Sequence, residues 1–355
     1  MISIHRSYMP EKKKLLKYID QIYENDQITN NGPLVRLLEK KLSIYFGTDN
    51  VVLVTNGTIA LEIVYKALNL TGNVITTPFS YVATTSSLKW IGADPVFADI
   101  DPKSFNINPK QIENISSNVS GIVATHVFGN PCEIEKIENI ADQKNLPVVY
   151  DASHGFHIQY KNKHLVNYGT VSTLSFHATK VFHTIEGGAI ITSDPKIAEN
   201  ARLIRNFGLE NGEIKRLGSN GKMSEFQAAM GLCMLDEFPI ALSKRQEVYE
   251  RYEKALSPYV EMQKRRPDTT NNYAYFPILL KDKQTVLKVI AELKNIQADA
   301  RRYFYPSLNT VDYVNSRSMS VSEDIASRIL CLPMHHAVEK DAQKHLISLT
   351  LKTIK

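Results

Sequence analysis

The feature that most constrains the fold is a regular alternation of short apolar runs with helix-like segments between residues 51 and 205. The runs lack strict polar alternation, which indicates strands buried on both faces. The expected strands are VVLVT (51–55), VITT (74–77), PVFADI (95–100), GIVATHVF (121–128), PVVYDA (147–152), VSTLSF (171–176) and GAIITS (188–193). Helices are expected at 58–70, 81–91, 133–144 and 196–205. Strands that alternate with helices predict an α/β protein with a mostly parallel central sheet.

The segments on either side of this alternation predict two domains. Residues 10–25 and 33–46 have the pattern of amphipathic helices that lead into the sheet. After about Leu235 the character changes, and a long charged helix is expected at 240–255. A chain of 355 residues has room for a large domain and a smaller one. We therefore predict a large domain at 1–240 and a smaller C-terminal α/β domain at 241–355.

Composition excludes several classes of protein. The net charge is only +5, and the basic runs at 12–14 and 264–266 lack interleaved aromatic residues, so no nucleic-acid partner is expected. No apolar stretch approaches 18 residues, so no membrane partner is expected either. The three cysteines are far apart and form no CxxC, which favours a reducing, cytoplasmic location. No HExxH occurs, and the side chains of adjacent His335 and His336 diverge, so no metal site is expected.

Polar residues follow the ends of several expected strands, where ligands bind in open α/β sheets. Gly57 and Thr58 lie between a strand and a helix N-terminus, a position that suits a phosphate as well as a simple helix cap. Asp151 ends a strand, and a buried carboxylate there needs a partner, either a structural cation or a protonated ring nitrogen. Ser175 is either a turn cap or a phosphate ligand.

An aromatic residue and a lysine complete the pattern. Tyr81 after the second strand is either part of the core or a platform for a flat ring. Lys180 follows the strand that ends near Ser175; it is either a surface lysine or a nucleophile, which must be uncharged to react. Together, an acid, a lysine and two phosphate-binding turns suit a ligand with a basic ring nitrogen, a phosphate and an aldehyde. Pyridoxal 5′-phosphate has all three.

The motifs in this order identify a resemblance. The chain resembles the DegT/DnrJ/EryC1/StrS sugar aminotransferases, which are pyridoxal-phosphate enzymes of the aspartate-aminotransferase fold (fold type I). The resemblance covers nearly the whole chain, from residue 31 to residue 336. The most specific runs are NGTIAL, VITTPFSYVAT, GADPVFADIDP, THVFGNP, VVYDASHG, SFHATKVFHTIEGGAI and GSNGKMSEFQAAMGL.

The resemblance implies a role for each matched residue. Lys180 matches the lysine that bonds to the cofactor and moves the proton, and Asp151 matches the partner of the ring nitrogen. Tyr81 matches the aromatic stacked on the ring. The phosphate-binding positions are Gly57, Thr58, Ile59 and Ser175, with Asn220 supplied by the neighbouring subunit. A homodimer with a shared active site follows.

Two positions depart from the family pattern. His154 stands where the family usually has a Gln that contacts the ring hydroxyl, and a histidine can also donate there. Lys222 stands where the family usually has Arg, which replaces a planar fork by a point charge and puts carboxylate recognition at this position in doubt.

The resemblance also implies the substrates. The reaction is amino transfer, usually from L-glutamate, to the keto group of a nucleotide-linked sugar. The run ADARRYFYPSL (298–308) resembles that of enzymes that aminate carbon 4 of dTDP-4-keto-6-deoxyglucose, used for O-antigen and similar polysaccharides. Candidate substrate contacts are Arg301, Arg302, Tyr303 and Tyr305, which otherwise serve as core or surface residues. The alternatives are a carbon-3 aminotransferase, a UDP-linked substrate, and a non-catalytic homologue.

Overall fold

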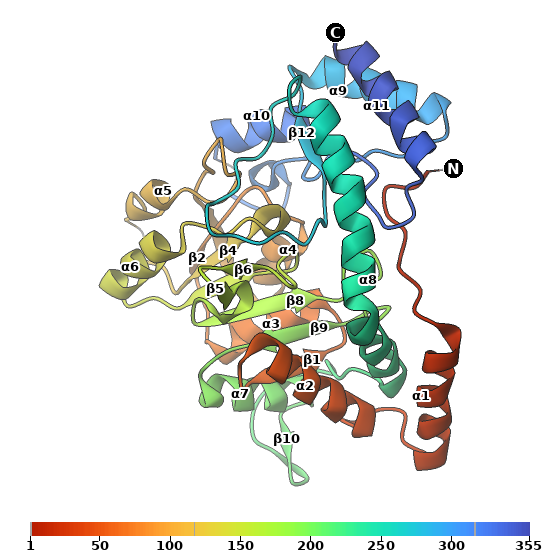
Figure 1. Ribbon diagram of the computed structural model, residues 1–355. Coiled ribbons are helices and arrows are strands. Elements are labelled where there is room, and N and C mark those ends of the chain that lie inside the picture. Colours follow the sequence, from red (N-terminus) through yellow and green to blue (C-terminus); the bar gives the residue numbers. More distant parts are fainter. Residues whose placement is uncertain (1, 117, 316) are drawn as a thin grey trace.

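A seven-stranded sheet forms the centre of the molecule. A computed structural model describes residues 2–116, 118–315 and 317–355. The strand order is β1-β9-β8-β5-β4-β2-β3, and β9 alone runs antiparallel to its neighbours. The strands are β1 (Val51–Val54), β2 (Asn73–Thr76), β3 (Asp94–Phe97), β4 (Ile122–Thr125), β5 (Val148–Asp151), β8 (Val171–Ser175) and β9 (Gly188–Ile191). The prediction of a mostly parallel sheet is confirmed (Figure 1).

Both faces of the sheet are apolar because successive side chains of each buried strand point to opposite faces. Val52 and Val54 pack on the face that carries α3 and α7, whereas Val51 and Leu53 pack with α2 and α8 on the other. A third cluster, with Ile122 of β4, extends that second face under α6. Helices therefore cover the sheet on both sides and leave its strand ends accessible.

The helices of the N-terminal part agree with the sequence pattern to within a few residues, except the short α5, which the pattern did not predict. They are α1 (Lys12–Asn25), α2 (Pro33–Phe46), α3 (Gly57–Ala67), α4 (Ala83–Trp90), α5 (Pro109–Glu113), α6 (Ile134–Lys144) and α7 (Pro195–Arg205). Two small hairpins join them: β6 (Gln159–Tyr160) with β7 (Lys163–His164), and β10 (Leu209–Glu210) with β11 (Glu213–Ile214). The strands β3 and β4 are shorter than predicted, and a 3₁₀ turn at Val127–Gly129 replaces the end of the expected strand 121–128.

The helix expected at 240–255 is the second half of a longer one. Helix α8 spans Glu225–Leu256 and contains Pro239, a residue type that is common at the first position of a helix and rare inside one. A proline inside a helix loses one hydrogen bond, but α8 packs against α1, α2 and α11 along its length, and this packing outweighs the loss. The predicted domain boundary at 240/241 falls inside α8. We propose that the two domains share this helix.

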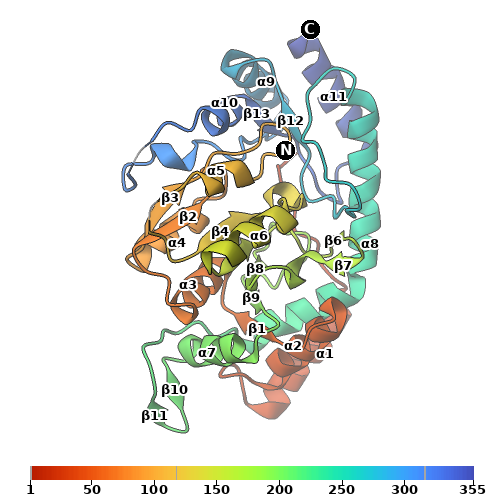
Figure 2. The ribbon, with the colours of Figure 1, turned by 90° about the vertical axis from the view of Figure 1, so that its left-hand side faces the viewer.

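The C-terminal part has its own small core. It consists of β12 (Pro277–Leu279), α9 (Lys283–Asn295), α10 (Ser320–Arg328), β13 (Ile329–Cys331) and α11 (Lys340–Ile354). Its apolar cluster begins at Val248 of α8 and includes residues of β12, α9, β13 and α11. A further cluster joins Phe79 and Phe128 of the sheet domain to Phe304 and Ile329. In Figures 1 and 2 α8 runs from the sheet region to α9 and α11.

Candidate active site

A cavity of about 500 Å³ opens at the carboxyl ends of the parallel strands, where the C-terminal part meets the sheet. Residues that follow β1, β2, β4, β5 and β8 all reach it. The predicted residues that line it are Gly57, Thr58, Tyr81, Asp151, His154, Ser175, Lys180, Arg301 and Tyr303. The structure therefore brings together residues that are up to 246 positions apart, as expected for ligand binding at this edge.

Lys180 lies on a tight turn after β8. Its backbone N–H donates to the His177 carbonyl over 2.9 Å, and Phe176 N donates to Gly187 O over 2.7 Å, which returns the chain towards β9. Gly188 approaches Asn56 so closely that an added Cβ would lie 2.7 Å from its carbonyl carbon. Burial lowers the pKa of Lys180 to about 8, although the Asp151 carboxylate acts in the opposite direction. Near neutral pH the uncharged amine is therefore a minority form, but one far more abundant than for an ordinary lysine.

Asp151 is buried at the end of β5 and is held by two donors. Thr84 Oγ1 donates to Oδ2 over 2.7 Å, and Ser153 N donates to Oδ1 over 3.1 Å. The Thr84 hydroxyl also contacts Ser80 Oγ over 2.7 Å, which in turn contacts Thr125 Oγ1 over 3.0 Å. This hydroxyl chain fixes the carboxylate at the cavity, where it faces whatever group binds beside Lys180.

The N-terminus of α3 forms a cradle suited to an anion. The first-turn N–H groups of Gly57 and Thr58 have no acceptor within the helix, and the helix dipole favours negative charge there. A Cβ on Gly57 would lie 2.8 Å from that of Ser175, so glycine keeps this space open. Ile59 is different from what the resemblance implies. Its N–H donates to Asn56 Oδ1 over 2.9 Å, and it does not line the cavity. Asn56 caps the helix instead.

His154 is buried with a fixed tautomer. Phe128 N donates to its Nδ1 over 3.2 Å, so the proton of the neutral ring is on Nε2. The ring is stacked on Phe304, with centroids 5.7 Å apart. Burial, followed by the positive charge of Lys180, lowers its pKa well below 6.5. Tyr81 lies at the mouth of the cavity and is 58% exposed.

The predicted substrate segment divides into two groups. Arg301 and Tyr303 line the cavity. Arg302 faces the other way: its guanidinium donates to the carbonyls of Ala326 and Ser327 and lies over the Tyr305 ring at 3.3 Å. Arg302 and Tyr305 are therefore placed outside the cavity.

Asn220 and Lys222 also lie away from the cavity of their own chain. Asn220 is exposed beside Asn206. Lys222 is half-buried, with its ammonium 4.6 Å from the centroid of the Phe207 ring. Burial, followed by the Arg205 charge, lowers the pKa of Lys222.

Several lining residues were not anticipated from the sequence. They are His5, Asn56, Leu61, Ser80, Ala83, Thr125, Ser153, Thr179, Glu186, Tyr275 and Phe304. Ser80 and Thr125 follow strands, so the rule that located Asp151 also points to them. His5 and Tyr275 come from segments without a strand pattern, and no signal in the sequence places them here.

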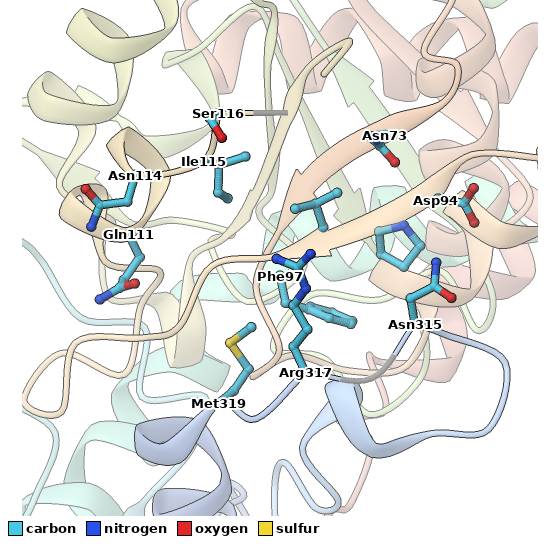
Figure 3. A pocket seen from close by; sticks show the side chains of 12 residues that line it. Asn73, Asp94, Phe97, Gln111, Asn114, Ile115, Ser116, Asn315, Arg317 and Met319 are labelled. Atoms are coloured by element: carbon cyan, nitrogen blue, oxygen red, sulfur yellow. The ribbon is translucent and has the colours of Figure 1, made fainter. Parts of the chain in front are cut away.

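A second cavity, of about 470 Å³, lies beside the edge strand β3. Figure 3 shows Arg317 extending into it between Gln111 and Asn114 on one side and Asp94 and Asn315 on the other. Asp94 is paired with Lys89 at 2.5 Å. The described lining of this cavity contains no lysine, histidine or cysteine, so the chemistry of the first cavity has no counterpart here.

Two further observations concern metals and membranes. Within the described residues, no group of three or more His, Cys, Asp or Glu side chains is placed to hold a metal ion. A membrane-crossing helix needs a longer apolar run than any helix has in the described part of the chain.

Comparison with known proteins identifies the family. The chain matches the DegT/DnrJ/EryC1/StrS aminotransferase family over residues 10–350. The chain belongs to this family. It is 39% identical to a dTDP-4-amino-4,6-dideoxy-D-glucose transaminase of Shigella dysenteriae, covering 100% of this chain and 99% of that protein. A transaminase of the same name from Escherichia coli is 34% identical, with 99% and 98% covered.

A solved structure agrees with this assignment. DesI in the presence of its TDP-sugar product superposes with a TM-score of 0.93 at 30% identity, covering 99% of this chain and 92% of that chain. The expected fold type, the aminotransferase class and the dependence on pyridoxal phosphate are thereby confirmed. The residues also fit the cofactor: the Gly57 cradle suits its phosphate, and Lys180 with a lowered pKa suits its aldehyde.

Proposed function

We propose that this family member transfers an amino group from L-glutamate to carbon 4 of dTDP-4-keto-6-deoxy-D-glucose, giving dTDP-4-amino-4,6-dideoxy-D-glucose. The names of two relatives that match the full chain support this substrate. The observation that carries the proposal is a single cavity lined by Lys180, Asp151 and the wall residues Arg301 and Tyr303. A guanidinium and a phenol at its edge suit a pyrophosphate and a sugar.

Each residue has a role in the proposed reaction. Bound pyridoxal phosphate supplies the electron sink for amino transfer. Lys180 Nζ, uncharged for part of the time because of its burial, would hold the cofactor through its aldehyde and would take and return the proton that moves during amino transfer. The Asp151 carboxylate, held by Thr84, keeps a proton on the ring nitrogen. Gly57, Thr58 and Ser175 hold the phosphate, and His154 Nε2 donates to the ring hydroxyl.

We also infer a homodimer with a shared active site. Asn220 and Lys222 do not line the cavity of their own chain, and they follow in sequence the hairpin β10–β11, which projects from the molecule (Figure 2). Phe207, Ile214 and Leu217 on this segment are 49%, 78% and 79% exposed, and such apolar patches mark interaction sites. A second copy would cover them and receive Asn220 at its phosphate cradle and Lys222 near its substrate.

The cellular setting follows from the proposed substrate. A 4-amino sugar on a nucleotide carrier is a donor for O-antigen or a similar polysaccharide. The three cysteines are all free and buried, which suits a reducing compartment such as the cytoplasm.

A product assay tests the proposal. Purified protein is incubated with pyridoxal phosphate, glutamate and, separately, dTDP-4-keto-6-deoxyglucose, a dTDP-3-keto-6-deoxy sugar or a UDP-4-keto sugar. Mass spectrometry detects the amine and NMR places it. We expect amination at carbon 4 of the dTDP sugar. Amination only at carbon 3, or only of the UDP sugar, would refute the substrate and keep the roles of Lys180 and Asp151. No amination, with no bound cofactor, would favour the non-catalytic alternative.

A further inference from the structure

The first residues of the chain cross from the C-terminal part to the turn that carries Lys180. Ile2 N donates to Gln297 O over 2.8 Å, and Asp299 N donates to Ile2 O over 2.8 Å. Figure 1 shows the segment descending from the N-terminus, beside the C-terminal part, to α1. At the other end, Ser7 Oγ donates to Ala178 O over 2.7 Å, two residues before Lys180. We call residues 2–8 the strap.

Two histidines fasten the strap in the same way. His335 Nδ1 accepts from Ala337 N over 3.2 Å, so its Nε2 carries the proton and donates to Ser3 O over 3.1 Å. His183 Nδ1 accepts from Ile185 N over 3.3 Å, and its Nε2 donates to Tyr8 O over 2.8 Å. One histidine belongs to the C-terminal part and the other to the turn of Lys180, so the strap is held at both sides of the cavity.

His5 is the strap residue that reaches the cavity wall. Its ring is stacked on Tyr303 with centroids 5.8 Å apart, and its edge meets Tyr275 at 5.9 Å. His5 Nε2 lies 3.3 Å from the Tyr303 hydroxyl. Burial, followed by the charges of Arg245, Lys180 and Arg301, lowers the pKa of His5 to about 3, so the ring is neutral at neutral pH.

The backbone of the segment that His5 contacts is anchored, because Arg301 exchanges two backbone hydrogen bonds with Cys331, but the side chains on its outer side are less firmly held. Arg301 and Tyr305 are exposed on either side of Tyr303, and the Arg301 side chain is 57% exposed. Tyr303 itself is only partly buried. Its phenol is positioned by the stacked imidazole, by the hydrogen bond to it and by the Tyr275 ring, which it meets edge-on at 5.9 Å.

We propose that the strap is a positioning element of the active site, in which His5 holds the Tyr303 hydroxyl towards the nucleotide-linked substrate. His5 acts through Tyr303 and is not a catalytic residue. Tyr303 shares this wall with Arg301, and both lie near the exposed Tyr81 at the cavity mouth. A nucleotide sugar is long enough to extend to the cavity mouth, whereas glutamate is too short to contact this wall. We therefore expect a change at His5 to weaken binding of the nucleotide sugar and to leave the reaction with glutamate unchanged. This inference rests on the proposed function.

Three substitutions of His5 separate its contributions. His5→Ala removes the ring and the hydrogen bond, His5→Phe keeps the stacking, and His5→Gln keeps a polar group near the Tyr303 hydroxyl. In His5→Ala we expect the KM for the keto sugar to rise about tenfold, with kcat and the reaction with glutamate unchanged. In His5→Gln we expect a KM for the keto sugar close to that of the wild type. His345→Ala, on the exposed face of α11, is the control and changes nothing.

Hydrogen exchange of the apoprotein tests the positioning without any substrate. In His5→Ala the amides of residues 301–305 should exchange about tenfold faster, and those of the sheet should not change. If these amides exchange faster in His5→Ala and the wild-type protein aminates none of the acceptors, the strap proposal is supported and the proposed function is refuted. Unchanged exchange at 301–305 in His5→Ala would overturn the strap proposal. So would a loss of activity in the reaction with glutamate as large as the loss in the reaction with the keto sugar.

Discussion

The backbone N–H of Phe128 donates to Nδ1 of His154 over 3.2 Å, and this bond fixes the proton of the neutral imidazole on Nε2. The family position that usually carries Gln is thus filled by a ring that presents a single donor. Since burial lowers the pKa of His154 well below 6.5, the donor is present throughout the neutral range.

We predict that His154→Leu binds pyridoxal phosphate about tenfold more weakly, because one hydrogen bond to a buried partner is lost. His154→Gln should stay within a few-fold of the wild type. Spectrophotometric titration of the apoprotein with the cofactor measures both affinities. Equal affinity of His154→Leu and the wild type would show that this donor does not reach the cofactor.

A second prediction concerns the pH dependence of cofactor attachment. The pKa of Lys180 is about 8, against an ordinary 10.5, so the uncharged amine becomes abundant two to three units earlier than for a surface lysine. The rate of covalent attachment should rise with pH up to about 8 and then level off. Borohydride reduction at successive times, followed by peptide mass spectrometry, locates and counts the labelled lysine. Lys180→Arg should give no label, and a rate that still rises steeply at pH 10 would contradict the lowered pKa.

The chemically reactive groups at the strand ends could be predicted from the sequence because strand ends carry their own signal. Gly57, Asp151 and Ser175 each follow a buried apolar run, and parallel strands bring their carboxyl ends to one edge. The choice among alternatives at each position came from the family motifs. Strand and helix patterns alone left Asp151 and Lys180 with ordinary structural interpretations.

The parts that were missed depend on contacts without a local pattern. His5 lies on an irregular segment 175 residues before Lys180, and only tertiary hydrogen bonds bring it to the cavity. Ile59 has the right position for a phosphate ligand, but the Asn56 side chain competes for its N–H. The first half of α8 was missed because Pro239 favours a helix start, and packing against α1 and α2 overrides that preference.

The hydroxyl that supports Asp151 gives a third prediction. Thr84→Val removes the 2.7 Å hydrogen bond to Oδ2 with little change of shape, so the carboxylate loses orientation and keeps its charge. We expect kcat to fall about tenfold in Thr84→Val and at least about a hundredfold in Asp151→Asn, which removes the charge itself. Single-turnover rates with glutamate provide the measurement. Thr85→Val is the matched control, because the neighbouring Thr85 hydroxyl has no hydrogen-bond partner among the described residues. A larger fall in rate in Thr84→Val than in Asp151→Asn would refute the prediction that the charge contributes more than its orientation.

Acid sensitivity gives a fourth prediction. His126 is fully buried, accepts a hydrogen bond from Cys132 N over 3.1 Å, and is stacked on Tyr150 at 4.4 Å. Burial, with a smaller effect of Arg266, lowers the pKa of His126 to about 3. A depressed folded-state pKa means that stability is complete above about pH 6.5 and is lost as the pH falls towards 3. The apoprotein should therefore melt at a lower temperature at pH 5 than at pH 7. His126→Asn keeps an acceptor for Cys132 N and removes the titrating group, so the Tm of this variant should fall less between pH 7 and pH 5. If its Tm fell as much as that of the wild type, His126 would not be a source of the acid sensitivity.

The buried pair Glu39–Arg205 gives the last prediction. Arg205 Nη1 donates to Glu39 Oε1 over 2.8 Å and to Leu53 O over 2.6 Å, and Leu53 N donates to the same carboxylate over 2.9 Å. The two side chains are only 7% and 15% exposed, so removing one leaves the other charge in a poorly solvated position.

Glu39→Gln should lower the free energy of unfolding by about 3 kcal/mol, because the Arg205 charge loses its counter-charge while it remains buried. The double variant Glu39→Gln with Arg205→Met should recover part of this loss, since it removes the uncompensated cation. Urea unfolding of the apoprotein measures both. The exposed pair Lys344–Asp341 is the control, and Asp341→Asn should change stability by less than about 0.5 kcal/mol. An equally small effect of Glu39→Gln would contradict this prediction. It would mean that solvent screens the Arg205 charge despite its burial, and that β1, which leads into the phosphate cradle, does not depend on this pair.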